Sequence, residues 1–328
     1  MTTTKTYSTL IILAVILALF VVGLGAYTRL THAGLGCPDW PGCYGEIVVP
    51  SAQTAEAHSP EQTFDTQKAW TEMVHRYFAG ALVMLILAIV IYSGLHRREQ
   101  YPLKLPIFIL IFVGFQAALG MWTVTLKLQP TIVMAHLLGG LTTLSLLWLL
   151  WLRARTHSAT YIPVSKGLRT LGMITLLVLI VQLALGGWTS ANYAGVACPS
   201  FPHCMGDSWL GNSDFSSALQ LWLPLGPNYE FGALDNPARQ GINVLHRLGA
   251  LAVTLFLSIW CIWILVRLRE LRFAATFTLL LLLVQLHLGM TNVLMNLPLH
   301  AAVTHNVIGA LLLLAVVGLN YQLYLRRG

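Results

Sequence analysis

Four histidines, each followed three to five residues later by a glycine, are the residues in this sequence whose type and spacing suggest chemistry. Each stands near the start of an apolar segment, and the pairs are His75/Gly80, His136/Gly139, His246/Gly249 and His305/Gly309. Neutral imidazole is a good ligand for iron, zinc or copper. A glycine lets a flat ligand approach the helix backbone, because it carries no side chain. A single buried histidine is usually hydrogen-bonded packing, but four in register predict two metal-binding pairs.

Heme explains these pairs better than a bare metal ion. Each half of the chain offers two strong ligands, whereas structural zinc uses four. A heme with two axial histidines needs those two ligands and a broad apolar slot. There is no C-x-x-C-H motif, so the heme is expected to be held without a covalent bond. Arg76 and Arg247 directly follow two of the histidines and are candidates to pair with heme propionates. The alternative is that they anchor helix ends at the membrane interface.

The two halves differ beside the histidine. Glu72 stands three residues before His75, but Asn243 holds the matching place before His246. The functional interpretation is a catalytic, proton-handling acid in the first half only, so that one site reacts and the other holds a permanent cofactor. The alternative is a carboxylate that stabilises the start of a helix.

Four of the five cysteines form two C-x5-C pairs with prolines inside, and the pairs are Cys37/Cys43 and Cys198/Cys204. Both pairs fall in segments expected outside the cytoplasm, where disulfides form readily. A loop-stapling disulfide is the favoured interpretation of each, and a redox-active first pair is the alternative. Cys261 lies inside an apolar segment and is interpreted as a packing residue.

The elements that position these residues are membrane helices. The 328 residues are 56% hydrophobic and only 9% charged, whereas soluble domains average roughly 25% charge. This excludes an ordinary soluble enzyme, a disordered chain and a nucleic-acid-binding protein. A span needs about 20 apolar residues. Eight such runs are found, near 8–28, 70–95, 105–126, 131–153, 168–190, 240–266, 273–294 and 300–324.

The basic residues predict the orientation. With eight spans both termini lie on one side, and if that side is the cytoplasm it holds 13 of the 19 basic residues. Of the 12 acids, only Glu99 and Glu270 would lie there. Such a lysine and arginine bias marks the cytoplasmic face. We therefore expect a multi-pass protein of the bacterial cell (inner) membrane, with both termini cytoplasmic and the long loops, about 29–69 and 191–239, outside.

The sequence is a tandem duplication. GAYTRLTHAGLGCPDWPGC in the first half matches GGWTSANYAGVACPSFPHC in the second, and Thr28/Thr189 and both cysteine positions differ by 161 residues. Repeats of this kind indicate a repeated structural unit. The predicted fold is an all-α membrane protein of eight transmembrane helices, arranged as two tandem four-helix bundles related by pseudo-two-fold symmetry. The predicted domains are 1–160 and 161–328.

The motifs GLGCPDWPGC, EMVHR, VMAHLLGG, VLHRLGA and VTHNVIGA, set in tandem four-helix halves, resemble those of the heme A synthase family over essentially the whole chain. The resemblance implies that the methyl group at ring position 8 of heme O is oxidised to a formyl group, which gives heme A for cytochrome oxidase. It implies that His75 and His136 receive the substrate heme, that His246 and His305 hold heme b, and that Glu72 is the family's glutamate. Cysteine pairs occur in only some members, and this chain is similar to those with pairs in both outer loops.

The partners implied are membrane lipid, heme O synthase and assembly factors of cytochrome oxidase, with a homo-oligomer left open. Two other function classes share some of these sequence features. A non-enzymatic diheme cytochrome b that carries electrons would share the histidine pairs but would need no acid in one half. A transporter built from repeats is expected to have broken helices near the middle of the membrane, and the sequence has none.

Overall fold

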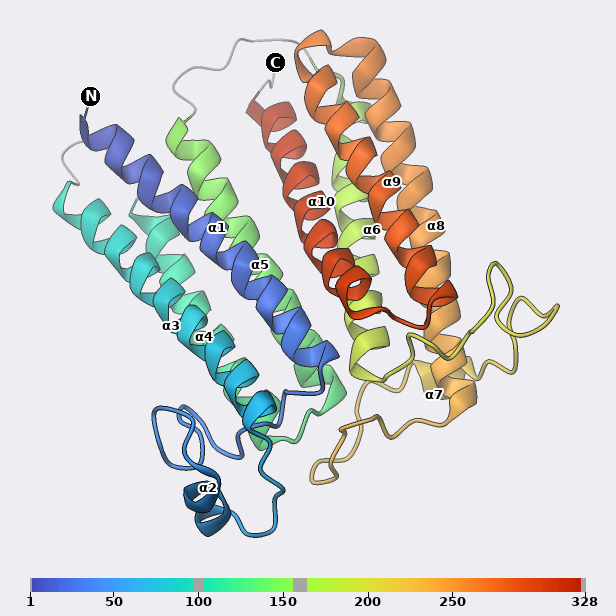
Figure 1. The fold of residues 1–328 in the computed structure, drawn as a ribbon. Coiled ribbons are helices and arrows are strands. Elements are labelled where there is room, and N and C mark those ends of the chain that lie inside the picture. Colours follow the sequence, from blue (N-terminus) through green and yellow to red (C-terminus); the bar gives the residue numbers. More distant parts are fainter. Residues whose placement is uncertain (1, 97–102, 156–163, 326–328) are drawn as a thin grey trace. The chain divides into compact units, whose positions relative to one another are not determined.

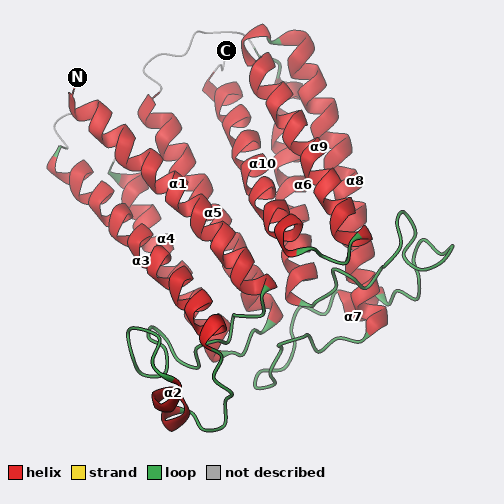
Figure 2. Ribbon diagram, in the orientation of Figure 1, coloured by secondary structure: helices red, strands yellow, loops and turns green. Residues whose placement is uncertain are grey.

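Eight long helices make up most of the computed structural model, which describes residues 2–96, 103–155 and 164–325 (Figure 1). They are α1 (Thr2–Leu30), α3 (Thr66–Leu95), α4 (Lys104–Thr125), α5 (Pro130–Arg155), α6 (Lys166–Ala191), α8 (Asn236–Arg267), α9 (Arg272–Leu294) and α10 (Leu299–Leu325). The short elements of the described residues are α2 (Ala52–His58), α7 (Phe215–Ala218) and the 3-10 turn Arg269–Leu271. No strand occurs in the described ranges, as Figure 2 shows.

All eight long helices are long and apolar enough to cross a membrane. Each begins and ends within a few residues of an expected span, except where α1, α3 and α8 extend further. Their apolar side chains are widely exposed, for example Ile111 at 68% and Leu283 at 61%. Lipid would cover such surfaces at no cost, because its tails are as apolar as leucine. The prediction of an all-α, multi-pass membrane protein with eight spans is therefore confirmed.

The chain forms two compact units. The first contains residues 1–147 and 221–233, and the second contains residues 148–220 and 234–328. The units therefore do not follow chain order strictly, because 221–233 comes from the second long loop. In the second unit α6 packs on α8, α8 on α9, α9 on α10 and α10 on α6, which closes a four-helix bundle. In the first unit α3 packs on both α1 and α4. The pseudo-two-fold relation between the halves stays a prediction.

The starts of four helices set the depth of the histidines. Asp65 caps α3 by accepting hydrogen bonds from the backbone N–H groups of Gln67 and Lys68. Asp235 caps α8 by accepting from that of Ala238. An aspartate in this position satisfies N–H groups that lack partners within the helix. α5 begins at Pro130 and α10 directly follows a proline, a residue that suits the first turn of a helix.

Candidate functional site

The four histidines meet in two pairs, one in each unit. In the first unit His75 on α3 and His136 on α5 lie close enough for a charge on one ring to affect the other. The same holds for His246 on α8 and His305 on α10 in the second unit. All four rings are partly buried. The structure thus brings together the residues that the sequence analysis paired, while their role as heme ligands stays a prediction.

Each histidine ring packs against a glycine on the preceding long helix. These contacts are Gly25–His75, Gly120–His136, Gly186–His246 and Gly289–His305, and a Cβ added to the glycine would lie 3.1, 3.1, 3.2 and 3.3 Å from the ring carbon Cε1. Nine in ten real Cβ contacts are looser than these. The helices can therefore approach closely only because these positions are glycine, and the close approach restricts where each ring can lie.

The glycines that follow the histidines were expected to leave open space for a flat ligand, and only one of the four does so. Gly80 has open space where a side chain would be. Glutamine side chains cover Gly139, Gly249 and Gly309 instead, with the nearest glutamine atom 2.0, 2.1 and 3.3 Å from an added Cβ. The expectation that all four leave room for a flat ligand is therefore wrong at these three positions, because a neighbouring amide fills the space.

The donor set of each unit fits a heme with two axial ligands. Among the described residues no group of three or more histidine, cysteine, aspartate or glutamate side chains could hold a metal ion. Each unit therefore offers a pair of imidazoles, which is too few for structural zinc and suits a heme iron. In addition, the Nδ1 atoms of His75 and His305 are buried without a hydrogen-bond partner.

Glu72 lies one turn before His75, and both oxygens of its buried carboxylate have partners. Oε2 accepts a hydrogen bond from the backbone N–H of Cys37 at 2.9 Å. Oε1 accepts one from the guanidinium of Arg76 at 2.5 Å, which is also an ion pair. Glu72 therefore connects the first cysteine loop to α3, a contact that the sequence analysis did not predict. Its role as the catalytic acid stays a prediction.

Asn243 makes the corresponding loop contact in the second unit, but as a hydrogen-bond donor rather than an acceptor. Its Nδ2 donates to the backbone carbonyl oxygens of Ala194 at 2.8 Å and Gly195 at 3.1 Å. The first loop is thus held by a carboxylate that accepts, and the second by an amide that donates. The difference between Glu72 and Asn243 changes the loop contact as well as the charge.

Arg76 and Arg247 hold the cysteine loops. Arg76 Nη1 donates to the backbone oxygen of Asp39 at 2.9 Å and to that of Gly42. Arg247 donates to the backbone oxygens of Ser200 at 2.9 Å and Cys198 at 2.8 Å. Arginine has five donors in a rigid fork, which allows one side chain to hold several loop carbonyls. Pairing of these arginines with heme propionates stays a prediction.

Both predicted disulfides are present, Cys37–Cys43 and Cys198–Cys204. All four cysteines are fully buried, which agrees with a role in stapling the loops. Cys261 is a free, buried cysteine within α8, as expected. The redox-active alternative for the first pair stays a prediction.

Three glutamines were missed by the sequence analysis. Gln116, Gln182 and Gln285 hydrogen-bond to ring nitrogens of His136, His246 and His305, each at 3.1 Å. The available signal was their constant place four residues before the glycine that supports the ring, as in QAALG, QLALG and QLHLG.

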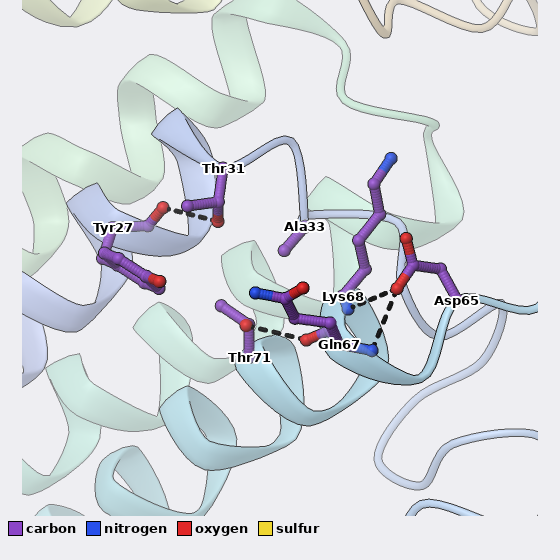
Figure 3. A pocket seen from close by; sticks show the side chains of 7 residues that line it. All are labelled: Tyr27, Thr31, Ala33, Asp65, Gln67, Lys68 and Thr71. Atoms are coloured by element: carbon purple, nitrogen blue, oxygen red, sulfur yellow. Dashed lines mark hydrogen bonds between the residues drawn. The ribbon is translucent and has the colours of Figure 1, made fainter. Parts of the chain in front are cut away.

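The first unit also has two pockets between the end of α1 and the start of α3. Figure 3 shows the more polar of them, with Asp65 accepting from the backbone of Gln67 and Lys68 and with Thr71 bonded to its own helix. The more apolar pocket is lined in part by Leu24 and Val74, the chain neighbours of Gly25 and His75. Neither His75 nor His136 lines this pocket.

Comparisons with known proteins agree with this arrangement. A family model described as cytochrome oxidase assembly protein matches residues 8–317. The chain is 44% identical to a heme A synthase of Shewanella oneidensis over 317 residues, which is 95% of each protein. It is 28% identical to heme A synthases of Rhizobium rhizogenes, over 94% of this chain and 87% of the relative, and of Alkalihalophilus pseudofirmus, over 82% and 78%. With two histidine pairs in place and a match over nearly its whole length, the chain belongs to the cytochrome oxidase assembly protein family.

Proposed function

We propose that this protein is a heme A synthase, an oxidoreductase that converts the methyl group at ring position 8 of heme O to the formyl group of heme A. The observation that carries the proposal is the pair of histidines in each unit of a chain that is 44% identical, over 95% of its length, to a heme A synthase. Two successive hydroxylations, each a two-electron oxidation that needs an external oxidant and a source of an oxygen atom, would give a gem-diol, and loss of water from it leaves the aldehyde.

We infer that the two units have different tasks. His75 and His136 would hold the iron of the substrate heme in the first unit. His246 and His305 would hold a resident heme b in the second. A bound heme b supplies one-electron redox chemistry, and the protein contributes its position and surroundings. The support for this division is that the acid next to a histidine, Glu72, is found only in the first pair.

Glu72 is proposed to hold or move a proton at the first site. Its carboxylate is buried, ion-paired with Arg76 and one helical turn from His75. A buried carboxylate retained in a membrane span is costly and is commonly functional. The competing interpretation is that Glu72 only connects the cysteine loop to α3, as its bond to Cys37 would suffice to do.

The function is tested by pigment extraction. The full chain is expressed with a source of heme O, and the extracted hemes are separated and identified by mass. Heme A, together with hydroxylated heme O, is the expected result, and His136→Ala should abolish both. If the wild-type protein carries only heme b and leaves heme O unchanged, it is a diheme cytochrome b and the proposal fails.

We also propose that the protein lies in the bacterial inner membrane with both termini cytoplasmic, and that it works beside heme O synthase and oxidase assembly factors. The support for the orientation is the distribution of lysine and arginine. Reporter fusions that are active only in the cytoplasm or only outside it, placed after residue 328 and within 207–213, test the orientation. Crosslinking followed by mass spectrometry tests the partners and a homo-oligomer.

A further inference from the structure

Three of the four histidines are held by a glutamine amide from the preceding long helix. Gln116 Nε2 lies 3.1 Å from His136 Nδ1 and donates to the backbone oxygen of the same residue at 2.7 Å. Gln182 repeats both contacts with His246, at 3.1 and 3.0 Å. In both contacts the amide N–H donates to Nδ1, so the ring hydrogen lies on Nε2. A metal bound at Nε2 requires the amide to turn, so that its Oε1 accepts from Nδ1–H.

The third glutamine makes a related contact. Gln285 Nε2 lies 3.1 Å from Nε2 of His305, so that Nδ1 is the nitrogen left without a partner. In all three cases the amide contacts one ring nitrogen, which is Nδ1 in His136 and His246 and Nε2 in His305.

Gln116 and Gln182 each depend on a glycine one turn beyond the histidine, whereas Gln285 lies 3.3 Å from an added Cβ at Gly309. A Cβ at Gly139 would lie 2.0 Å from Gln116 Oε1, and one at Gly249 would lie 2.1 Å from Gln182 Oε1. Atoms cannot approach so closely, so any larger residue at these positions would expel the amide. A glutamine on one helix and a glycine on the next therefore form a pair, which we call the device, beside three of the histidines. The pairs are Gln116/Gly139, Gln182/Gly249 and Gln285/Gly309.

The device is absent at His75. The position four residues before Gly25 is Val21, and the positions three and four after His75 are Phe78 and Ala79. The His75 Nδ1 atom is buried and has no hydrogen-bond partner. The His75 ring packs against Gly25, but no glutamine hydrogen-bonds to it among the described residues.

We propose that Gln116, Gln182 and Gln285 are positioning residues that fix three heme-ligating histidines, and that His75 is left as the exchangeable ligand of the first unit. The inference rests on the proposed function, since it takes the four histidines to bind heme. Groups that hydrogen-bond a ligating histidine fix its ring and raise its basicity, and their loss typically weakens binding about 10- to 100-fold. A resident heme needs two such ligands, whereas a heme that enters and leaves needs one that releases it.

The amide oxygens support this role. The Oε1 atoms of all three glutamines are buried without a hydrogen-bond partner among the described residues. An imidazole bound to iron through one nitrogen carries its hydrogen on the other and needs an acceptor there. An amide offers a donor at one end and an acceptor at the other, so a half-turn of the side chain would present Oε1 to the ring N–H. For Gln116 and Gln182 this turn gives up the bond to the backbone oxygen of the same histidine.

The test uses Gln182→Met and Gln182→Glu in the purified full-length protein. Methionine keeps the length but cannot accept a hydrogen bond, so the midpoint potential of heme b should rise and heme affinity should fall about tenfold or more. Glutamate accepts more strongly and should lower the potential below that of the wild type. Gln322→Met, about 25 Å further along α10 than His305 at 1.5 Å per residue, is the matched control and should leave both quantities unchanged.

Two outcomes overturn the inference without touching the proposed function. One is a Gln182→Met protein that binds heme b with wild-type affinity, potential and low-spin spectrum. The other is a Gln182→Glu protein whose potential does not fall. If the wild-type protein binds no heme at all, the proposed function itself fails, and that result is read before any variant is compared.

A gain-of-function variant tests the exception. Val21→Gln with Phe78→Gly would introduce the device beside His75, and Phe78→Gly alone is the control. The double variant should retain extractable heme O or heme A through detergent washes that strip them from the wild type and from the control, while the heme b content stays the same. Equal loss from all three proteins would overturn the assignment of His75 as the exchangeable ligand.

Discussion

At the scale of single residues, Glu72 matters most for the proposed chemistry. It can be interpreted as a residue that attaches the cysteine loop to α3 or as an acid that handles a proton. The carboxylate accepts from Cys37 through Oε2 and pairs with Arg76 through Oε1. A loop-holding role needs only an acceptor oxygen, whereas proton handling needs an ionisable group. The two roles therefore differ in what a glutamine at this position can replace.

We expect Glu72→Gln to keep the first cysteine loop in place and to lower conversion of heme O by about 100-fold, since general acid–base groups contribute 10²- to 10⁴-fold. Extraction of heme A measures the conversion. Asn243→Ala is the control, because it removes the loop contact of the second unit without changing any charge. Full heme A formation by Glu72→Gln would reduce Glu72 to a structural residue.

At the scale of helices, glycines position the histidine rings by letting neighbouring helices approach. α4 contains both kinds of glycine. Gly120 lies against His136, where an added Cβ would be 3.1 Å from Cε1, and Gly114 has open space around it. Alanine favours a helix over glycine by about 1 kcal/mol, so the two positions should respond in opposite directions.

We expect Gly114→Ala to be neutral or to raise the thermal midpoint in detergent. Gly120→Ala should displace the His136 ring by a few tenths of an ångström and weaken heme binding in the first unit. Thermal melts and extracted heme O and heme A per protein measure the two effects. Equal behaviour of the two variants would show that the contact with His136 does not limit the position of the ring.

At the scale of the whole molecule, part of the second long loop belongs to the first unit. Within 221–233, the Tyr229 N–H donates to the backbone oxygen of Lys127 at 3.0 Å, and Glu230 pairs with Lys68 at 3.6 Å. Phe231 stacks at a tilt on His32, with the ring centroids 5.1 Å apart. The side chain of Tyr229 is buried, and the Lys68–Glu230 pair is more exposed.

We expect Tyr229→Ala to release this segment at a cost of about 3–5 kcal/mol, the usual loss for a buried aromatic side chain. Glu230→Gln should cost at most about 1 kcal/mol, because ion pairs near the surface contribute little. Limited proteolysis within 221–233 and thermal melts measure both. Protection of the segment in Tyr229→Ala equal to that in Glu230→Gln would contradict the expectation.

The sequence alone determined the eight spans, the repeat of 161 residues, the four histidines and the cysteine pairing. These follow from runs of apolar residues and from motifs that recur along the chain, which can be recognised without knowing which residues meet in space. Tertiary structure alone decided that Arg76 and Arg247 hold the cysteine loops and that 221–233 packs within the first unit. It also decided that amides hold three of the four histidines. Such contacts join residues 20 or more positions apart on different elements, and only the packing of helices determines which side chains meet.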